Sequence, residues 1–250
     1  MRRALLIGYY GRQNAGDDAF LAVSAWGARK FLGVERVWAN ASTIPDCCRQ
    51  SVRPLGLPSA IPGAGTLTRF RRHWLLPQFQ HLIFGGGSNF HTTRIIEDFI
   101  ALVRAAGAGP HFALGISVGP FRDRGAAGKC AELLSMLDFV GLRDQASLDR
   151  VRELDLTKPA EYTFDIAPLL ALALGTKLPV RPPPQRKVLA VALCNNERFI
   201  GGKTDEEISR LDAVAGAIRQ CAHEGDCEEV VLVDMNGHPA EGDAAVHMSL

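Results

Sequence analysis

The chain has 250 residues, of which 47% are hydrophobic and 22% charged, and its formal net charge is +1. This composition is ordinary for a globular protein with a sizeable core, and the small net charge gives no sign of nucleic-acid binding. No stretch approaches the ~20 apolar residues that a membrane-spanning helix needs. The six cysteines form no CxxC pair and no metal-binding spacing, so we expect no metal site.

The N-terminal stretch MRRALLIGYYG superficially resembles a signal peptide, because two arginines precede an apolar run. The run ends after about six residues and no small-residue cleavage site follows, which favours a buried strand. We therefore expect a cytoplasmic protein with reduced, mostly buried cysteines.

Apolar strand-like runs then alternate with helical patterns. The expected strands are 3–10, 35–41, 81–87, 111–119 and 138–144, and the expected helices are 17–32, 94–106, 126–137 and 144–154. Short, nearly all-apolar strands separated by helices indicate an α/β fold, with a Rossmann-like parallel sheet covered on both faces. In the first helix, small and aromatic residues share one face that is expected to pack on the sheet: Phe20, Ser24, Gly27 and Phe31.

Two regions depart from this alternation. Residues 41–80 contain prolines, glycines and the basic-aromatic run RFRRHW, and we expect irregular structure there with room for one helix. Residues 176–187 contain four prolines among basic residues, which favours an extended linker. The expected domains are thus 1–175 and 188–250, and the second is too short for a complete doubly wound α/β domain.

Charge is distributed unevenly along the chain. Residues 1–80 hold 11 Lys+Arg against 4 Asp+Glu, whereas residues 201–250 hold 3 against 11. A basic first part suits an anionic substrate, and solvated surface charge explains the distribution equally well.

The turn after the first strand has three glycines, but it matches neither a dinucleotide fingerprint nor a phosphate loop. Asp17 and Asp18 occupy the first turn of the following helix, where two carboxylates would repel a phosphate. Asn14, Asp17 and Asp18 are therefore candidates for hydrogen bonds to sugar hydroxyls, and a simple capped helix is an equal alternative.

FGGGSNFHTT places three glycines directly after a buried strand. Ligands of open parallel sheets bind beyond the carboxyl ends of the strands, and glycine lets backbone approach them closely. We therefore expect a substrate site formed by Gly86, Gly87, Ser88, Asn89 and His91. GISVGP, residues 115–120, ends another strand in a similar way and is a weaker candidate.

Arg143 stands at the end of a predicted strand, just before the expected helix cap Asp144. Its planar guanidinium suits a carboxylate or a phosphate in the ligand crevice. The alternative is a structural salt bridge with Asp144 or Asp165.

Five segments, taken in order, resemble the polysaccharide pyruvyl transferase family: GYYGRQNAGDDAFL, FGGGSNF, GISVGPF, VGLRDQASLDRV and FDIAPLL. The resemblance covers roughly residues 5–175, with a looser match at VVLVDMNGHPAEGD. It implies a two-domain fold like that of the GT-B glycosyltransferases. It also implies transfer of the enolpyruvyl group of phosphoenolpyruvate onto two sugar hydroxyls, which leaves a pyruvate ketal and phosphate.

The same resemblance implies that Arg143 binds phosphoenolpyruvate, a co-substrate, and that no further cofactor is needed. The implied partners are phosphoenolpyruvate and a lipid- or nucleotide-linked sugar, with peripheral membrane association and oligomeric state left open. The family's later R-x-H-x-x-I pattern has no match before Leu250, so we expect a fragment or a shortened relative. The alternatives are a GT-B glycosyltransferase that uses a nucleotide sugar, or a catalytically silent sugar-binding remnant.

Overall fold

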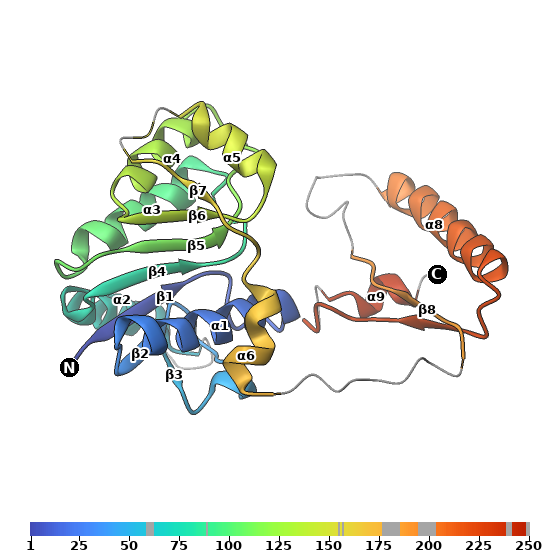
Figure 1. The fold of residues 1–250 in the computed structure, drawn as a ribbon, viewed down its shortest axis with the longest axis horizontal. Helices are drawn as coiled ribbons and strands as arrows, with labels where there is room; N and C mark the ends of the chain where they lie inside the picture. The colour runs from blue at the N-terminus through green and yellow to red at the C-terminus, as the bar shows by residue number, and fades with distance from the viewer. Residues whose placement is uncertain are drawn as a thin grey trace. The chain divides into compact units, whose positions relative to one another are not determined.

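A computed structural model describes residues 1–58, 63–88, 90–154, 156, 158–176, 186–194, 204–238 and 242–248 (Figure 1). The chain forms two compact units. The first unit comprises Met1–Gly11 and Gly16–Lys177, and the second comprises Arg12–Ala15 and Leu178–Leu250. Most of the predicted linker lies outside the described residues.

The first unit is built on a seven-stranded sheet in the order β3-β2-β1-β4-β5-β6-β7, and every neighbouring pair is parallel. The strands are β1 (Arg3–Ile7), β2 (Arg36–Ala39), β3 (Val52–Pro54), β4 (His81–Gly85), β5 (Phe112–Ile116), β6 (Phe139–Leu142) and β7 (Glu161–Tyr162). The strand order reverses between β1 and β4, and in such sheets ligands bind at the carboxyl ends of the strands near this point. The predicted Rossmann-like parallel sheet is confirmed.

Helices connect these strands (Figure 1). They are α1 (Ala15–Leu32), α2 (Ala64–Leu75), α3 (Thr93–Ala105), α4 (Ala126–Ser135), α5 (Gln145–Arg152) and α6 (Leu170–Leu174), with the short 3₁₀ turns η1 (Asp46–Cys48), η2 (Leu76–Gln78) and η3 (Ala167–Leu169). Because successive strand side chains point to opposite faces, β1 contributes to two cores. Leu5 and Ile7 pack in one cluster with α3 and α4, whereas Ala4 and Leu6 pack in the other with α1.

The second unit contains the parallel pair β8 (Val188–Val191) and β9 (Glu229–Leu232), together with α8 (Thr204–Glu224) and α9 (Ala244–His247). Asp243 is buried and its carboxylate accepts hydrogen bonds from the backbone N–H groups of Met235 and Asn236. His247 Nδ1 lies 2.6 Å from Asp234 Oδ1.

Within the described residues, no helix has both the length and the apolar composition needed to cross a bilayer.

Three expectations need correction. Phe20 and Ser24 are buried as predicted, but Phe31 is 70% exposed, because it lines an open apolar hollow with Phe112 and Phe139 instead of packing inside the core. Residues 41–80 contain strand β3 and two 3₁₀ turns beyond the single helix expected, because pairing with β2 stabilises a strand whose own sequence is not strand-like.

The cysteines are not mostly buried. Cys48 and Cys130 are buried, whereas Cys47, Cys194 and Cys221 are exposed. Burial depends on the direction of each side chain: within η1, Cys48 packs in a core cluster whereas its neighbour Cys47 is exposed.

Candidate functional site

Side chains from four segments gather at the carboxyl edge of the sheet in the first unit. Ser117 follows β5, Arg143 follows β6, Asp165 follows β7, and Asp17 lies in the first turn of α1. Parallel strands end at one edge of the sheet, so residues far apart in sequence meet there.

Arg143 is held in place by two neighbouring loops. Its Nε donates a hydrogen bond to Ser117 Oγ at 2.5 Å, and its NH1 group donates to Asp165 Oδ2 at 3.1 Å. The backbone N–H of Arg143 also donates to the carbonyl of Ile116. The structural salt bridge that was the alternative interpretation is therefore present with Asp165, and it fixes the direction of the guanidinium.

A second layer of hydrogen bonds orients Ser117. Its hydroxyl donates to Asp144 Oδ2 at 2.6 Å, and Asp144 Oδ1 accepts from the backbone N–H of Ser147, which confirms Asp144 as the cap of α5. Burial raises the pKa of Asp144, but the hydrogen bonds from Ser117 and Ser147 and the charge of Arg143 outweigh it and hold the pKa below its usual value. Asp144 is thus a charged anchor for Ser117 and for the helix.

Asp17 differs electrostatically from the other carboxylates. Burial, reinforced by the charge of Asp18 and opposed by that of Arg143, raises the pKa of Asp17 to about 6. Asp17 also acts on the buried phenol of Tyr10, whose pKa is raised mainly by burial. The carboxyl of Asp17 therefore exchanges a proton near neutral pH, which the sequence alone did not indicate.

Asp18 lies in a different environment from Asp17. Its Oδ1 is buried without a hydrogen-bond partner among the described residues, and burial raises its pKa. Its charge acts on Cys48, which follows the β2 strand. The two adjacent aspartates therefore interact through their charges but lie in different surroundings, and the sugar-binding role of Asp18 stays a prediction.

Gly86 and Gly87 have structural reasons for being glycine. Gly86 has a φ of +72°, and a Cβ there would lie 2.4 Å from the Phe20 ring. Gly87 has a φ of +82°, and its carbonyl accepts a hydrogen bond from the backbone N–H of Ser117. The glycine-rich turn therefore packs α1 against the sheet and supports the loop that carries Ser117.

The other predicted substrate residues lie in different surroundings from the cluster around Arg143. Ser88 is exposed, and Asn89 lies outside the described residues. His91 is half-buried, and its pKa is lowered by burial and by the charge of Arg122. Asn14 belongs to the second unit, where it forms an isolated bridge with Asn236. Their roles in binding stay predictions.

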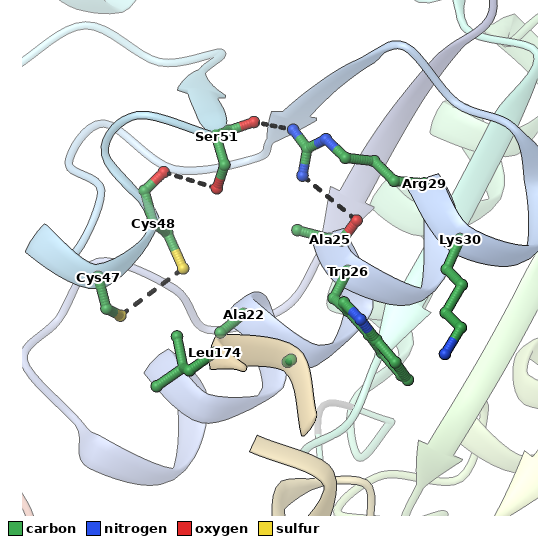
Figure 2. Close-up of a pocket in the computed structure, with 10 residues that line it drawn as sticks. Ala22, Ala25, Trp26, Arg29, Lys30, Cys47, Cys48, Ser51 and Leu174 are labelled. Carbon is green, nitrogen blue, oxygen red and sulfur yellow. Dashed lines mark hydrogen bonds between the residues drawn. The ribbon is translucent and has the colours of Figure 1, made fainter. Parts of the chain in front are cut away.

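Apart from this cluster, a hollow of about 630 Å³ lies beside α1, and the sequence did not indicate it (Figure 2). Arg29 reaches across it and donates hydrogen bonds to the carbonyls of Ala25 and Ser51. On the opposite wall the sulfurs of Cys47 and Cys48 lie 3.7 Å apart. Burial, with the nearby Cys47, raises the pKa of Cys48 to about 12, so this thiol is not an activated nucleophile.

Among the described residues, no three His, Cys, Asp or Glu side chains are grouped as metal ligands. This edge of the sheet can therefore supply one oriented guanidinium, one carboxyl with a pKa of about 6, and the backbone of two glycine-containing loops.

Comparison with known proteins identifies the family to which the chain belongs. The chain has no significant match among curated proteins. One solved structure, described as E. coli heptosyltransferase WaaC with ADP-2-deoxy-2-fluoro heptose, is similar with a TM-score of 0.37 and 15% sequence identity, over 96% of this chain and 70% of that chain. The sequence profile of the polysaccharide pyruvyl transferases matches residues 14–222, well over half of the chain. The chain therefore belongs to the polysaccharide pyruvyl transferase family.

Proposed function

We propose that this protein transfers the enolpyruvyl group of phosphoenolpyruvate onto a sugar of a polysaccharide or of its precursor, and so forms a pyruvate ketal. The observation that supports the proposal is the position of Arg143, which Ser117 and Asp165 hold at the carboxyl edge of the sheet beside Asp17. Family membership supports a transferase that acts on a polysaccharide.

The reaction needs three kinds of group. A cation must stabilise the phosphate as it leaves, an acid must protonate the methylene carbon of the enol, and a base must accept protons from the sugar hydroxyls. Arg143 supplies an oriented cation whose geometry matches a carboxylate or a phosphate. Asp17, with a pKa of about 6, is suited to transfer a proton at neutral pH.

The balance of charge at the site links anion binding to protonation. Asp17, Asp144 and Asp165 lie around the guanidinium of Arg143. A phosphoenolpyruvate anion placed there is repelled by each ionised carboxylate. The pKa of Asp17 is raised to about 6, so protonation of Asp17 relieves part of this repulsion near neutral pH.

This linkage predicts a pH-dependent KM. Below pH 6 Asp17 is mainly neutral and above it mainly ionised, so the KM for phosphoenolpyruvate should rise as the pH rises through about 6. The Asp17→Asn variant has no carboxyl at this position, so its KM lacks the rise that ionisation of Asp17 causes. The ratio of the wild-type KM to the Asp17→Asn KM should therefore rise roughly tenfold between acid and alkaline pH.

Phosphoenolpyruvate itself titrates in this range, but it does so identically for both proteins, and the ratio cancels that effect. Initial rates over a pH series measure both values of KM. A ratio that stays constant with pH would show that the charge of Asp17 does not act on the bound anion.

The function is tested by incubating the protein with phosphoenolpyruvate and a panel of lipid-linked and nucleotide-linked sugars. Phosphate release should depend on the acceptor, and the acceptor should gain the mass of pyruvic acid less one water. Release of a nucleoside diphosphate from a nucleotide sugar, with no phosphate from phosphoenolpyruvate, would instead establish glycosyl transfer. Binding of an acceptor without release of either product would establish a sugar-binding protein without this activity.

A further inference from the structure

Helix α2 presents its apolar side chains to the outside of the protein. Of its 12 residues, Ala64 alone is buried. Leu67, Phe70 and Trp74 are 49%, 65% and 65% exposed. These three positions follow the i, i+3, i+7 spacing of one helix face, so they form a continuous apolar stripe. We call these three side chains the α2 stripe.

The face of α2 that points toward the protein is largely polar, and its contacts fix how the helix is rotated. Thr68 Oγ1 accepts a hydrogen bond of 3.0 Å from the backbone N–H of Leu57. The guanidinium of Arg71 lies 5.0 Å from the centre of the Trp38 ring, a cation–π contact. Leu75, at the end of the helix, packs against the core cluster. The outward direction of the α2 stripe is therefore built into the packing.

An ordinary surface helix has the reverse arrangement, with apolar residues toward the core and polar residues toward solvent. α3 in this protein follows that rule, because Ile96, Ile100 and Val103 are buried. In α2 the apolar side chains face away from the sheet that the helix covers. Such a face is stabilised only when another apolar medium covers it.

The charges of α2 indicate what that medium is. The helix sequence AGTLTRFRRHWL contains Arg69, Arg71, Arg72 and His73 and no acidic residue. At 100° per residue, His73 borders the α2 stripe and Arg69 follows it on the same side. Arg71 and Arg72 turn toward the protein, where Arg71 stacks on Trp38 and Arg72 lies near the charge of Asp98. A basic helix of low overall hydrophobicity with Phe, Leu and Trp on one face is typical of helices that lie in the interfacial region of a bilayer. Trp is enriched at this depth, where its ring is in apolar surroundings and its N–H in polar ones.

We propose that α2 docks on an anionic phospholipid surface, with the α2 stripe inserted among the acyl chains near the headgroups and the exposed Arg69 paired with a lipid phosphate. The basic character of residues 1–80, with 11 Lys+Arg against 4 Asp+Glu, adds long-range attraction to the same surface. The proposal does not rest on the pyruvyl transfer reaction, and the two can fail separately.

Co-sedimentation with vesicles tests the proposal. The full chain should bind vesicles that contain phosphatidylglycerol and phosphatidylcholine more tightly than vesicles of phosphatidylcholine alone. Raising the salt concentration should weaken the binding, because screening shortens the range of the attraction. Equal binding to the two kinds of vesicle, or no binding to either, overturns the proposal.

Matched variants locate the binding surface. Arg69→Gln should lower the partition coefficient about fivefold, the effect expected of one cation at an anionic surface. The double variant Phe70→Ser with Trp74→Ser should lower the partition coefficient by more than about tenfold, because it removes two apolar side chains that the bilayer would bury. The control is Phe31→Ser in α1, since Phe31 is 70% exposed and lies on a different helix. A Phe31→Ser variant that loses as much binding as the double variant overturns the assignment to α2.

Fluorescence supplies a second measurement that does not depend on sedimentation. Trp74 is exposed, so its emission should shift to shorter wavelength when phosphatidylglycerol vesicles are added. Trp74→Phe should keep most of the binding and lose most of the shift. If Trp74→Phe keeps the shift, or if the double variant instead abolishes a self-association that occurs without vesicles, the α2 stripe is not a membrane-docking surface.

Discussion

Arg143→Ala is expected to lower kcat/KM for phosphoenolpyruvate by about a hundredfold to a thousandfold, with little change in folding. The guanidinium lies in a prearranged position, because Ser117 and Asp165 hold it through hydrogen bonds of 2.5 and 3.1 Å. A prearranged cation costs no reorganisation when charge develops on the leaving phosphate, and the loss of one such donor typically costs about 3 to 4 kcal/mol of transition-state stabilisation. The measurement is phosphate release under saturating acceptor.

Two further variants separate this role from general effects of charge. Arg143→Lys keeps the charge but loses the planar group that contacts both Ser117 and Asp165, so it should recover only a small part of the activity. Arg152→Ala removes an exposed arginine that forms an ion pair with Asp149 on the same helix, and it should leave the activity unchanged. Arg143→Ala activity close to wild type would show that Arg143 serves structure alone.

Gly86→Ala is expected to destabilise the protein by about 3 kcal/mol, which would make the glycine essential for packing rather than for contact with a ligand. The left-handed φ of +72° costs a residue with a Cβ about 1 kcal/mol, and the new Cβ would lie 2.4 Å from the Phe20 ring. Overpacking in a tightly filled core costs a further 1 to 3 kcal/mol. Chemical denaturation measures the free energy of unfolding.

Two controls test this explanation. Gly128→Ala lies in α4 with no atom within 4 Å of the added Cβ, and it should stabilise the protein by roughly 0.5 to 1 kcal/mol. In a Phe20→Ala background the ring is absent, so Gly86→Ala should cost less than it does in the wild type. An equal cost in both backgrounds would mean that the contact with Phe20 is not the cause.

At the carboxyl edge, packing and the proposed chemistry therefore belong to different residues. Gly86 and Gly87 set the backbone path and the packing of α1, whereas Arg143 and Asp17 are the side chains that we propose for the reaction. The structure assigns packing roles to the glycines for which the sequence suggested contact with a ligand. The proposed binding of the anion rests on Arg143, whose side chain the surrounding loops hold.

Much of the fold follows from local sequence. The strands around Leu5, Phe84 and Val140 were predictable because short apolar runs separated by helical patterns can bury both faces of a sheet only as parallel strands under helices. The cap at Asp144 was predictable because the capping hydrogen bond forms between residues three apart. β3 was missed because its pairing with β2 outweighs weak local preferences.

The composition of the site did not follow from local sequence in the same way. Arg143 could be singled out because it follows a strand, and Asp165 could be named as a possible partner. The raised pKa of Asp17 could not be predicted, since it depends on burial and on the distances to Asp18 and Arg143. The distance to Arg143 is set by the order of the strands in the sheet, which the sequence pattern leaves open.

By itself, the sequence determined the class of fold, the family resemblance and the arginine at the end of a strand, because these depend on residue types and on spacings of a few residues. The tertiary structure decided which side chains surround Arg143, why Gly86 is a glycine, and that the apolar face of α2 points outward. Each of these depends on contacts between residues that are distant in the chain, such as Gly86 with Phe20 and Arg143 with Ser117. Such contacts form only when the sheet has assembled.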